Sequence, residues 1–258
     1  MELKNNTILI TGGSSGFGLE FTKRFLELGN TVIITGRNQE KLNKTKRLFP
    51  EVHIIKSDVT SINDIISLQE KVTKEFPNLN ILINNAGEME IINLNDSKTE
   101  LSKLTQEIEV NLMAPIRMVQ QFLPHLKNQK SAAILNVTSG LALVPFPISP
   151  VYGASKSGLR SYTKSLRVQL KHTNIKVFEL LAPGASTPLS AKFNGIDGFD
   201  DKQNITPEKV VDAAINGLQK NSFEIYPGSA KILKVLSRLA PNFIFMQLSK
   251  VGAKYYSN

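Results

Sequence analysis

Short apolar runs alternate with segments of helical periodicity along most of the chain. Near-continuous apolarity over four to seven residues is typical of strands that are buried on both faces. Strands that alternate with helices favour right-handed crossovers and a parallel sheet. The pattern therefore predicts an α/β fold, a doubly wound, seven-stranded parallel sheet with helices on both faces. The predicted strands are TILIT at 7–11, TVIIT at 31–35, VHIIK at 52–56, ILIN at 81–84, AAILNVT at 132–138, IKVFEL at 175–180 and FEIY at 223–226.

The segments between the strands carry helical spacing. Phe17, Phe21, Phe25 and Leu28 are three or four positions apart, and Gly29 is a plausible helix stop. Residues 184–205 break this rhythm, because they are rich in Gly, Asp and Asn and lack periodicity. We interpret 184–205 as a mobile active-site flap, with an ordinary surface loop as the alternative. A core domain is expected over 1–228.

The last thirty residues, 229–258, form an extension beyond the seventh strand. A stripe of apolar residues predicts a helix that is flanked by basic residues and ends before Pro241. Basic amphipathic helices can lie on anionic membranes, but more often they pack on their own domain or on a partner subunit. We expect packing or dimerisation here, with membrane contact as the alternative. The stripe comprises Ile232, Leu233, Val235, Leu236 and Leu239, flanked by Lys231, Lys234 and Arg238.

Composition narrows the chemistry. The chain of 258 residues has no cysteine, and its three histidines are scattered, so the sequence predicts no metal site and no thiol chemistry. The net charge of +9 favours a phosphate-bearing partner, but no helix-turn-helix, finger or aromatic RNA-binding motif accompanies it, so nucleic-acid binding is not expected. The short apolar run near the N-terminus does not resemble a signal peptide, which predicts a cytoplasmic protein.

A glycine-rich turn follows the first predicted strand. In TGGSSGFG the glycines stand where the backbone turns tightly and approaches a phosphate at a helix N-terminus, which predicts dinucleotide binding rather than an ordinary strand-to-helix turn. The spacing is Gly-x-x-x-Gly-x-Gly. The candidate cofactor-binding residues of this turn are Gly12, Ser14, Ser15, Gly16, Phe17 and Gly18.

Arg37 points to the form of the dinucleotide. Many NAD-binding folds place an acidic residue after the second strand, where it binds the ribose 2′-hydroxyl. Here Gly36 and Arg37 take that place, so a 2′-phosphate meets a guanidinium instead of a carboxylate, and NADP(H) is the predicted cofactor. Asp58, after the third strand, is expected at the adenine edge, with a helix cap as the alternative.

Further candidates follow the later strands. NNAG at 84–87 places Asn85, Ala86 and Gly87 at a strand end, where small residues allow a ligand to approach the backbone. Ser139 ends the fifth strand, and Tyr152 and Lys156 lie one turn apart on the next helix. Because carboxyl ends of parallel strands share one edge with the starts of the following helices, we expect Ser139, Tyr152 and Lys156 to converge.

In their order these motifs resemble the short-chain dehydrogenase/reductase family, whose fold is Rossmann-type. TGGSSGFG, NNAG, Asn111 in EVN, Ser139, Tyr152-x-x-x-Lys156 and PGASTP together span residues 11–188. TVIITGR, NVTSGLA and PVYGASK add a narrower resemblance, to the Gram-positive oxidoreductases associated with the lipoteichoic acid D-alanylation operon.

The resemblance assigns roles to the residues. It implies that Tyr152 is the general acid/base, that Ser139 orients the substrate oxygen, and that Lys156 lowers the Tyr152 pKa and holds the nicotinamide ribose. Asn111 is expected to hold a water that links Lys156 to solvent, with helix packing as the alternative. Thr187 is expected at the nicotinamide carboxamide, with a turn role as the alternative.

The end of the sixth predicted strand and one apolar segment complete the expected site. Pro183 and Gly184, which end that strand, are added to the cofactor-binding set. The apolar segment LALVPFP at 141–147 is expected to face substrate.

The sequence thus predicts an NADP(H)-dependent oxidoreductase that interconverts an apolar carbonyl compound and a secondary alcohol. The resemblance also implies a homodimer or homotetramer. The alternative is a dinucleotide-responsive regulatory or scaffolding protein, linked to cell-envelope (teichoic acid) metabolism, that keeps the fold without catalysis. The complete set of Ser139, Tyr152 and Lys156 argues against that alternative.

Overall fold

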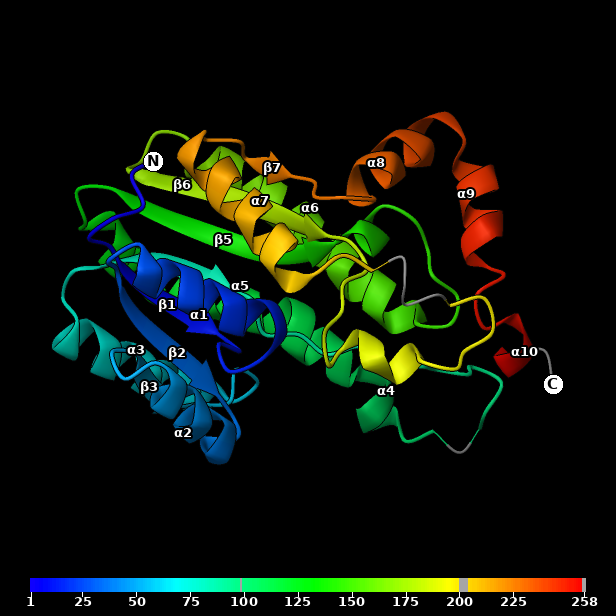
Figure 1. Ribbon diagram of the computed structural model, residues 1–258, viewed down its shortest axis with the longest axis horizontal. Coiled ribbons are helices and arrows are strands. Elements are labelled where there is room, and N and C mark those ends of the chain that lie inside the picture. Colours follow the sequence, from blue (N-terminus) through cyan, green and yellow to red (C-terminus); the bar gives the residue numbers. More distant parts are fainter. Residues whose placement is uncertain (98, 200–203, 257–258) are drawn as a thin grey trace.

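Seven parallel strands form one sheet at the centre of the molecule (Figure 1). The computed structural model describes residues 1–97, 99–199 and 204–256. The strand order is β3-β2-β1-β4-β5-β6-β7, and every pair is parallel, as predicted. The strands are β1 Thr7–Thr11, β2 Thr31–Gly36, β3 His53–Lys56, β4 Leu79–Asn84, β5 Ala132–Ser139, β6 Ile175–Ala182 and β7 Glu224–Ile225.

Helices cover both faces of the sheet because successive side chains of each strand point to opposite faces. Ile8 and Ile10 of β1 pack in a core with α1, α2 and α7, whereas Leu9 packs in a second core with α3, α5 and α6. The major helices are α1 Gly16–Glu27, α2 Gln39–Leu48, α3 Ile62–Glu75, α4 Leu101–Ile108, α5 Ala114–Lys127, α6 Pro150–Gln169 and α7 Pro207–Gln219. Short turns of helix are η1 Glu109–Met113, η2 Gly140–Ala142 and η3 Ser190–Phe193.

Strand bounds differ from the prediction at several ends. β4 begins two residues earlier than predicted, and β5 and β6 run one and two residues further, to Ser139 and Ala182. The last predicted strand shrinks to Glu224–Ile225, because it lies at the edge of the sheet and pairs with β6 alone. α1 ends as predicted, and Gly29 after it has a positive φ of 77°.

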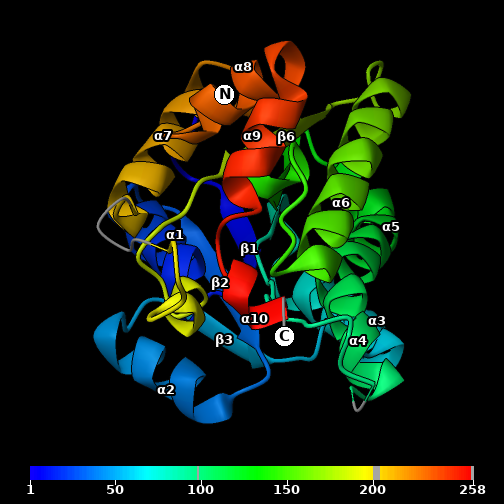
Figure 2. The same cartoon turned by 90° about the vertical axis from the view of Figure 1, so that its right-hand side faces the viewer.

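The C-terminal extension forms three short helices, α8 Ala230–Leu239, α9 Pro241–Leu248 and α10 Ala253–Tyr256. Pro241 begins α9, so the predicted helix end before it is correct. In Figure 2 these helices descend across the face where the strands end, between α1 and α7 on one side and α4, α5 and α6 on the other. In the described part of the chain, no helix has the length and apolarity that a membrane crossing requires.

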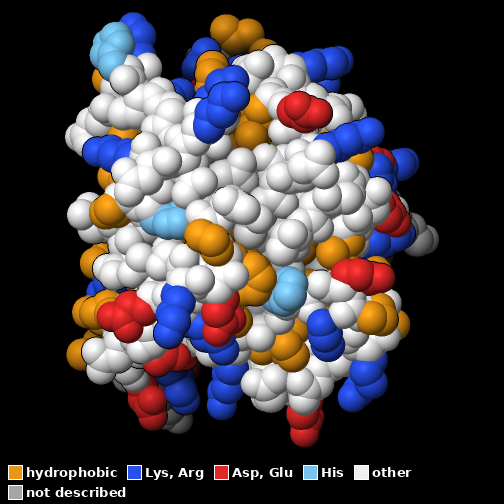
Figure 3. Space-filling model, turned by 90° about the vertical axis from the view of Figure 1, so that its left-hand side faces the viewer, with side chains coloured by type: hydrophobic (Ala, Val, Ile, Leu, Met, Phe, Trp, Pro, Cys, Tyr) orange, Lys and Arg blue, Asp and Glu red, His pale blue; other side chains and the backbone are white. Residues whose placement is uncertain are grey.

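The opposite face, at the amino-terminal edge of the sheet, shows no concentration of one charge. Figure 3 shows Lys, Arg, Asp and Glu side chains interspersed on it, with histidines among them. His53 lies at the start of β3 and packs against Phe76, and His125 contacts the carbonyl of Leu79 at the start of β4. These histidines therefore lie away from the predicted site, as expected from the sequence.

A buried ion pair fixes α6 against β6. Arg160 donates to the fully buried carboxylate of Glu179 at 2.8 Å, and Thr138 donates to its other oxygen at 2.8 Å. Arg160 also donates to the hydroxyl of Tyr226 at 3.2 Å. Because α6 carries both Tyr152 and Lys156, this pair helps to set where those side chains lie over the sheet.

Removal of one partner is expected to destabilise the protein strongly. Arg160→Met leaves an uncompensated buried carboxylate, which costs about 3–5 kcal/mol of unfolding free energy. Arg160→Met/Glu179→Met removes both charges and is expected to recover much of that loss. Urea unfolding of the three proteins tests this, and equal losses in the single and double variants would contradict it.

Candidate active site

The sheet opens a crevice where its strand order reverses. β1 pairs with β2 on one side and with β4 on the other, so the loops after β1 and β4 diverge at the carboxyl edge. Thr11 ties the two loops together, since its hydroxyl accepts hydrogen bonds from the backbone N–H groups of Asn85 and Ala86, each at 3.0 Å. The Asn85 amide donates to the Thr11 carbonyl at 3.0 Å. A pocket of about 810 Å³ lies above this junction.

The glycine-rich turn forms one end of the pocket. Gly12 has a φ of 68°, and a Cβ on Gly18 would lie 2.1 Å from the Gly12 carbonyl oxygen, so neither position tolerates a side chain. Ser15 precedes α1 but makes no side-chain cap, and the first turn of α1 carries no acidic residue. The backbone N–H groups at the N-terminus of α1 are therefore available to an anion, such as the diphosphate of a dinucleotide.

Arg37 and Asp58 line the same end of the pocket. Arg37 forms an ion pair with Glu88 across the crevice, and its side chain is about half exposed. Lys41 is a second cation in this wall, which sequence reasoning missed because it lies one turn inside α2. Asp58 accepts from the backbone and hydroxyl of Thr60, whereas Ser61 caps α3. The helix-cap alternative for Asp58 is therefore wrong.

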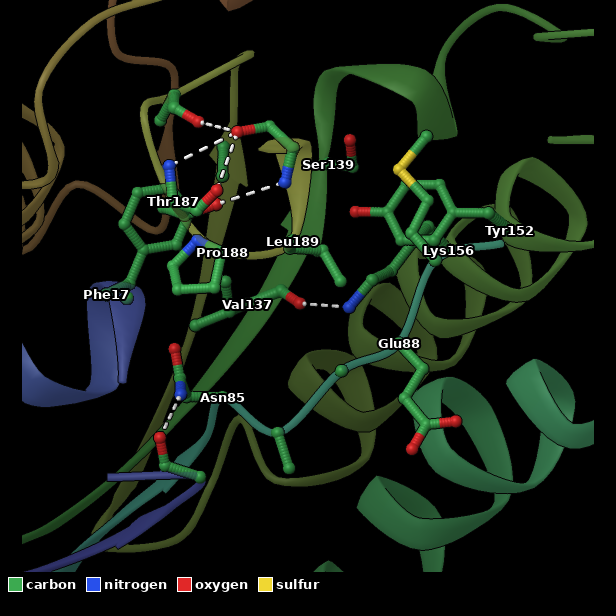
Figure 4. A pocket seen from close by; sticks show the side chains of 18 of the residues that line it. Phe17, Asn85, Glu88, Val137, Ser139, Tyr152, Lys156, Thr187, Pro188 and Leu189 are labelled. Carbon is green, nitrogen blue, oxygen red and sulfur yellow. Dashed lines mark hydrogen bonds between the residues drawn. The ribbon is translucent and has the colours of Figure 1, made fainter. Parts of the chain in front are cut away.

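Ser139, Tyr152 and Lys156 converge in the middle of the pocket, as the sequence predicts. Figure 4 shows the hydroxyl of Tyr152 pointing into the space between Ser139 and the amine of Lys156. Lys156 is 4% exposed, and its Nζ donates to the Val137 carbonyl at 3.0 Å. The Ser139 hydroxyl accepts from the Leu141 backbone at 3.1 Å, and it also forms a hydrogen bond with the Tyr152 side chain.

Burial opposes the expected lowering of the Tyr152 pKa, and the lowering by Lys156 together with the nicotinamide charge stays a prediction. Burial raises the pKa of Tyr152 to about 12, against the opposing effect of a hydrogen bond with Ser139. Burial also lowers the pKa of Lys156 to about 8. The low-dielectric surroundings disfavour both charged forms. Near neutral pH the Tyr152 hydroxyl therefore carries its proton.

Asn111 lies in a turn of π-helix between α4 and α5. It accepts from the backbone N–H of Glu88 at 2.9 Å and donates to the Glu88 carbonyl at 2.8 Å and to the Ser155 hydroxyl at 3.0 Å. Asn111 therefore fixes the chain after β4 to the catalytic helix α6. These bonds favour the packing alternative, and the expected water link to Lys156 stays a prediction.

Glu107 is a candidate that sequence reasoning missed. One oxygen of this fully buried carboxyl accepts from the Glu90 backbone at 3.0 Å, and the other has no hydrogen-bond partner among the described residues. Burial raises its pKa to about 7, and its charge acts on both Tyr152 and Lys156. The sequence feature that could have identified Glu107 is its position four residues before Asn111, which places both residues on the same side of a helix.

The loop after β6 forms the wall opposite the glycine turn. Pro183, Gly184 and Thr187 all line the pocket, and a Cβ on Gly16 would lie 3.6 Å from the Thr187 side chain. The backbone N–H of Thr187 donates to the Ser190 hydroxyl at 3.2 Å, so Thr187 also takes part in a turn. Its expected contact with the nicotinamide carboxamide stays a prediction.

The 184–205 segment is joined at its base and only partly described. Ser186 donates to the Ile205 carbonyl at 3.0 Å, and Ile205 donates to the Gly184 carbonyl at 3.2 Å. Residues 200–203 of this segment lie outside the described part of the chain. The interpretation of 184–205 as a mobile flap stays a prediction.

The substrate end of the pocket is mainly apolar. Leu141 and Phe146 of the 141–147 segment line it, whereas Leu143 packs against the cluster of Leu181 and Tyr226. The expected contact of 141–147 with substrate stays a prediction. Leu189, Lys192, Phe193 and Phe199 of the 184–205 segment, which the sequence assigns to the active site, also line the pocket. Sequence reasoning missed the contribution of two other segments, because nothing local shows that they meet here. Their lining residues are Glu88, Met89, Glu90, Leu248 and Val251.

Over 1–97, 99–199 and 204–256, no three His, Cys, Asp or Glu side chains are grouped so that they could hold a metal ion.

The family comparison agrees with this geometry. The short chain dehydrogenase family model matches residues 6–195, and the chain belongs to this family of oxidoreductases, which bind NAD or NADP and act on CH–OH or C=O groups. The chain is 40% identical over 249 residues to the uncharacterized oxidoreductase DltE of Bacillus subtilis, covering 96% of this chain and 98% of the relative. The narrower resemblance to Gram-positive oxidoreductases of that kind is thereby confirmed.

Solved structures show the same fold with either cofactor. A short chain dehydrogenase from Burkholderia cenocepacia in complex with NADP has a TM-score of 0.83 at 24% identity, covering 96% of this chain and 99% of that one. A short chain dehydrogenase/reductase from Burkholderia phymatum in complex with NAD has a TM-score of 0.83 at 22% identity, covering 96% of both chains. The fold by itself therefore does not select between NAD and NADP.

The raised pKa of Glu107 predicts a specific pH dependence of stability. Because the folded protein holds this proton more tightly than the unfolded chain, stability is lost as the pH rises from about 4.5 through about 7. Glu107→Gln removes the ionisation and is expected to gain up to roughly 3 kcal/mol of unfolding free energy over wild type between pH 5 and pH 8. Urea unfolding at both pH values measures the difference.

Glu109→Gln is the matched control for Glu107→Gln. Glu109 lies two residues further on and pairs with Arg117 at a partly exposed site. The assignment would be contradicted if the unfolding free energy of Glu107→Gln differed from that of wild type by the same amount at pH 5 and pH 8. It would also be contradicted if Glu109→Gln showed the same pH-dependent difference as Glu107→Gln.

Proposed function

We propose that the protein is an NADP(H)-dependent oxidoreductase that interconverts a carbonyl compound and a secondary alcohol, with Tyr152 as general acid/base. One observation carries this proposal. A single pocket runs from the uncapped glycine turn of α1 to the converging side chains of Ser139, Tyr152 and Lys156. A site for a dinucleotide and a site for proton transfer are thus parts of one cavity.

The side chains supply the proton chemistry. NADPH, when bound, supplies the hydride for reduction, and NADP⁺ accepts it in the reverse reaction. The Tyr152 hydroxyl donates its proton to the carbonyl oxygen during reduction, and the Tyr152 phenolate takes the proton from the alcohol during oxidation. The Ser139 hydroxyl, which lies within hydrogen-bonding reach of Tyr152, donates to the same oxygen and orients it. Lys156, held by Val137, stabilises the phenolate that remains after proton transfer.

The preference for NADP(H) rests on the cations beside the glycine turn. Arg37 and Lys41 both line the pocket there, and Gly36 occupies the position at which a carboxylate would repel a 2′-phosphate. The Arg37 side of its ion pair with Glu88 is about half exposed, so solvent screens the pair and a phosphate can compete with Glu88 for the guanidinium. We therefore assign Arg37 to the 2′-phosphate.

Arg37→Ala tests the cofactor preference. Loss of a charge-assisted hydrogen bond of about 1.5–3 kcal/mol is expected to raise the KM for NADPH roughly tenfold to a hundredfold. The KM for NADH is expected to change little, because NADH has no 2′-phosphate. Steady-state kinetics with both cofactors measure the two values, and an equal rise for both would contradict the role of Arg37.

Tyr152→Phe tests the chemistry itself. NADPH oxidation is followed at the nicotinamide absorbance with a panel of apolar ketones, aldehydes and β-keto acyl compounds. General acid catalysis contributes about 10²–10⁴-fold, so the variant is expected to lose at least a hundredfold in kcat while still binding NADPH. Binding of NADPH to wild type without turnover on any substrate would favour the dinucleotide-responsive regulatory alternative, with its link to cell-envelope (teichoic acid) metabolism.

The proposal extends to the setting of the reaction. The apolar lining from Met89, Phe146 and Phe193 favours an apolar carbonyl or alcohol substrate. We place the activity in the cytoplasm, and on the family resemblance we expect a homodimer or homotetramer.

A further inference from the structure

Exposed apolar side chains are concentrated in the C-terminal extension. Of the fourteen large hydrophobic residues that are exposed in the described part of the chain, seven lie within 229–256. This segment is about a ninth of the chain, so the concentration is well above an even spread. The seven residues are Ile232, Val235, Leu239, Phe243, Phe245, Met246 and Tyr255.

Within each helix, exposed apolar residues share one side. Ile232, Val235 and Leu239 share one side of α8 and are 60%, 50% and 79% exposed. The helix is interrupted at Ala240, and in the separate helix α9 Phe243 and Met246 lie three positions apart and are 50% and 57% exposed. We call these five residues the outer face of the extension. Figure 1 shows α8 and α9 as an arch that stands away from the sheet at the edge of the molecule.

The inner side of the same helices is occupied. Leu233 lies against Gly140, where an added Cβ would be 2.9 Å from its side chain, and it lines the active-site pocket. Leu248 and Val251 also line that pocket, and Ile244 is buried. Packing on the domain, as expected from the sequence, therefore accounts for the inner side of the extension and leaves the outer face uncovered.

Basic residues accompany the outer face. Lys231, Lys234 and Arg238 follow one another along the neighbouring side of α8 at the same three-to-four spacing. Lys250 and Lys254 follow later in the extension, and residues 229–258 contain no Asp or Glu. Among the described residues, only Lys254 of these five cations forms an ion pair, with Asp197.

This charge decides between two occupants of the outer face. A second copy related by twofold symmetry would bring the same patch against itself, and so would juxtapose two sets of basic residues with no acid between them. At an anionic lipid surface, the outer face can be buried among the acyl chains while the basic residues beside it contact the negatively charged headgroups.

We propose that α8 and α9 dock the protein on the surface of an anionic membrane, with the outer face inserted between the lipid headgroups. Because the inner side of the same helices forms a wall of the pocket, docking brings the substrate end of the site to the lipid surface. The substrate class that follows, an amphiphilic carbonyl or alcohol dissolved in the membrane, rests on the proposed function, whereas docking itself does not.

Vesicle co-sedimentation of the full-length protein tests docking without any turnover. Wild type is expected to bind vesicles that contain phosphatidylglycerol, less at high salt, and to bind phosphatidylcholine vesicles weakly. Leu239→Gln/Phe243→Gln is expected to reduce binding by roughly tenfold or more, since two large apolar side chains lose their burial. Lys231→Gln/Arg238→Gln is expected to reduce the preference for phosphatidylglycerol by roughly tenfold or more.

Matched controls separate docking from general stickiness. Leu48 on α2 and Leu101 on α4 are 58% and 80% exposed, comparable to residues of the outer face, but lie outside the extension. Leu48→Gln/Leu101→Gln is expected to bind vesicles like wild type. An equal loss in this control, or no binding of wild type to phosphatidylglycerol vesicles, would overturn the proposal.

Two further readouts complete the test. Sedimentation velocity compares the oligomeric state of wild type with that of Leu239→Gln/Phe243→Gln. If wild type is an oligomer that binds no vesicles, and the variant dissociates, then a second copy of the chain covers the outer face and the membrane proposal is overturned. NADPH oxidation with a water-soluble substrate is expected to be unchanged in the outer-face variant. That assay separates a failure of docking from a failure of the proposed function.

Discussion

The pairing of β1 with β4 is the constraint on which the site depends. At this pair the strand order turns from one half of the sheet to the other, and the two following loops separate to leave a crevice. Thr11 then ties the loop after β4 to the end of β1 through its hydroxyl and carbonyl groups. The glycine turn and the chain around Asn85 are thereby held at one edge, and only small residues fit between them.

Burial controls the electrostatics of the active site. The pKa values of Tyr152, Lys156 and Glu107 all move toward the neutral forms, because each group is removed from water. A neutral phenol suits proton donation, while a lysine with a pKa of about 8 changes charge within the working range of many enzymes. The Glu107 charge raises the pKa of both Tyr152 and Lys156, so the protonation of these two groups depends on Glu107 as well as on burial.

The C-terminal extension links the site to the outside of the molecule. Its inner side contributes Leu233, Leu248 and Val251 to the pocket, while its outer face carries the apolar and basic side chains. One short segment thus forms the wall of the substrate end and the surface that we propose for membrane docking. In this arrangement the choice of substrate and the place of reaction depend on the same helices.

The sequence by itself determined the strand order along the chain, the parallel sheet, the glycine turn and the convergence of Ser139, Tyr152 and Lys156. These features follow from local apolar patterns and from the rule that parallel strands end at one edge. Only the tertiary structure decided the direction of the Tyr152 pKa, the packing of Asn111, the burial of Glu107 and the entry of Leu248 and Val251 into the pocket. Each of these depends on which distant side chains exclude water from a given atom, and no local pattern records that.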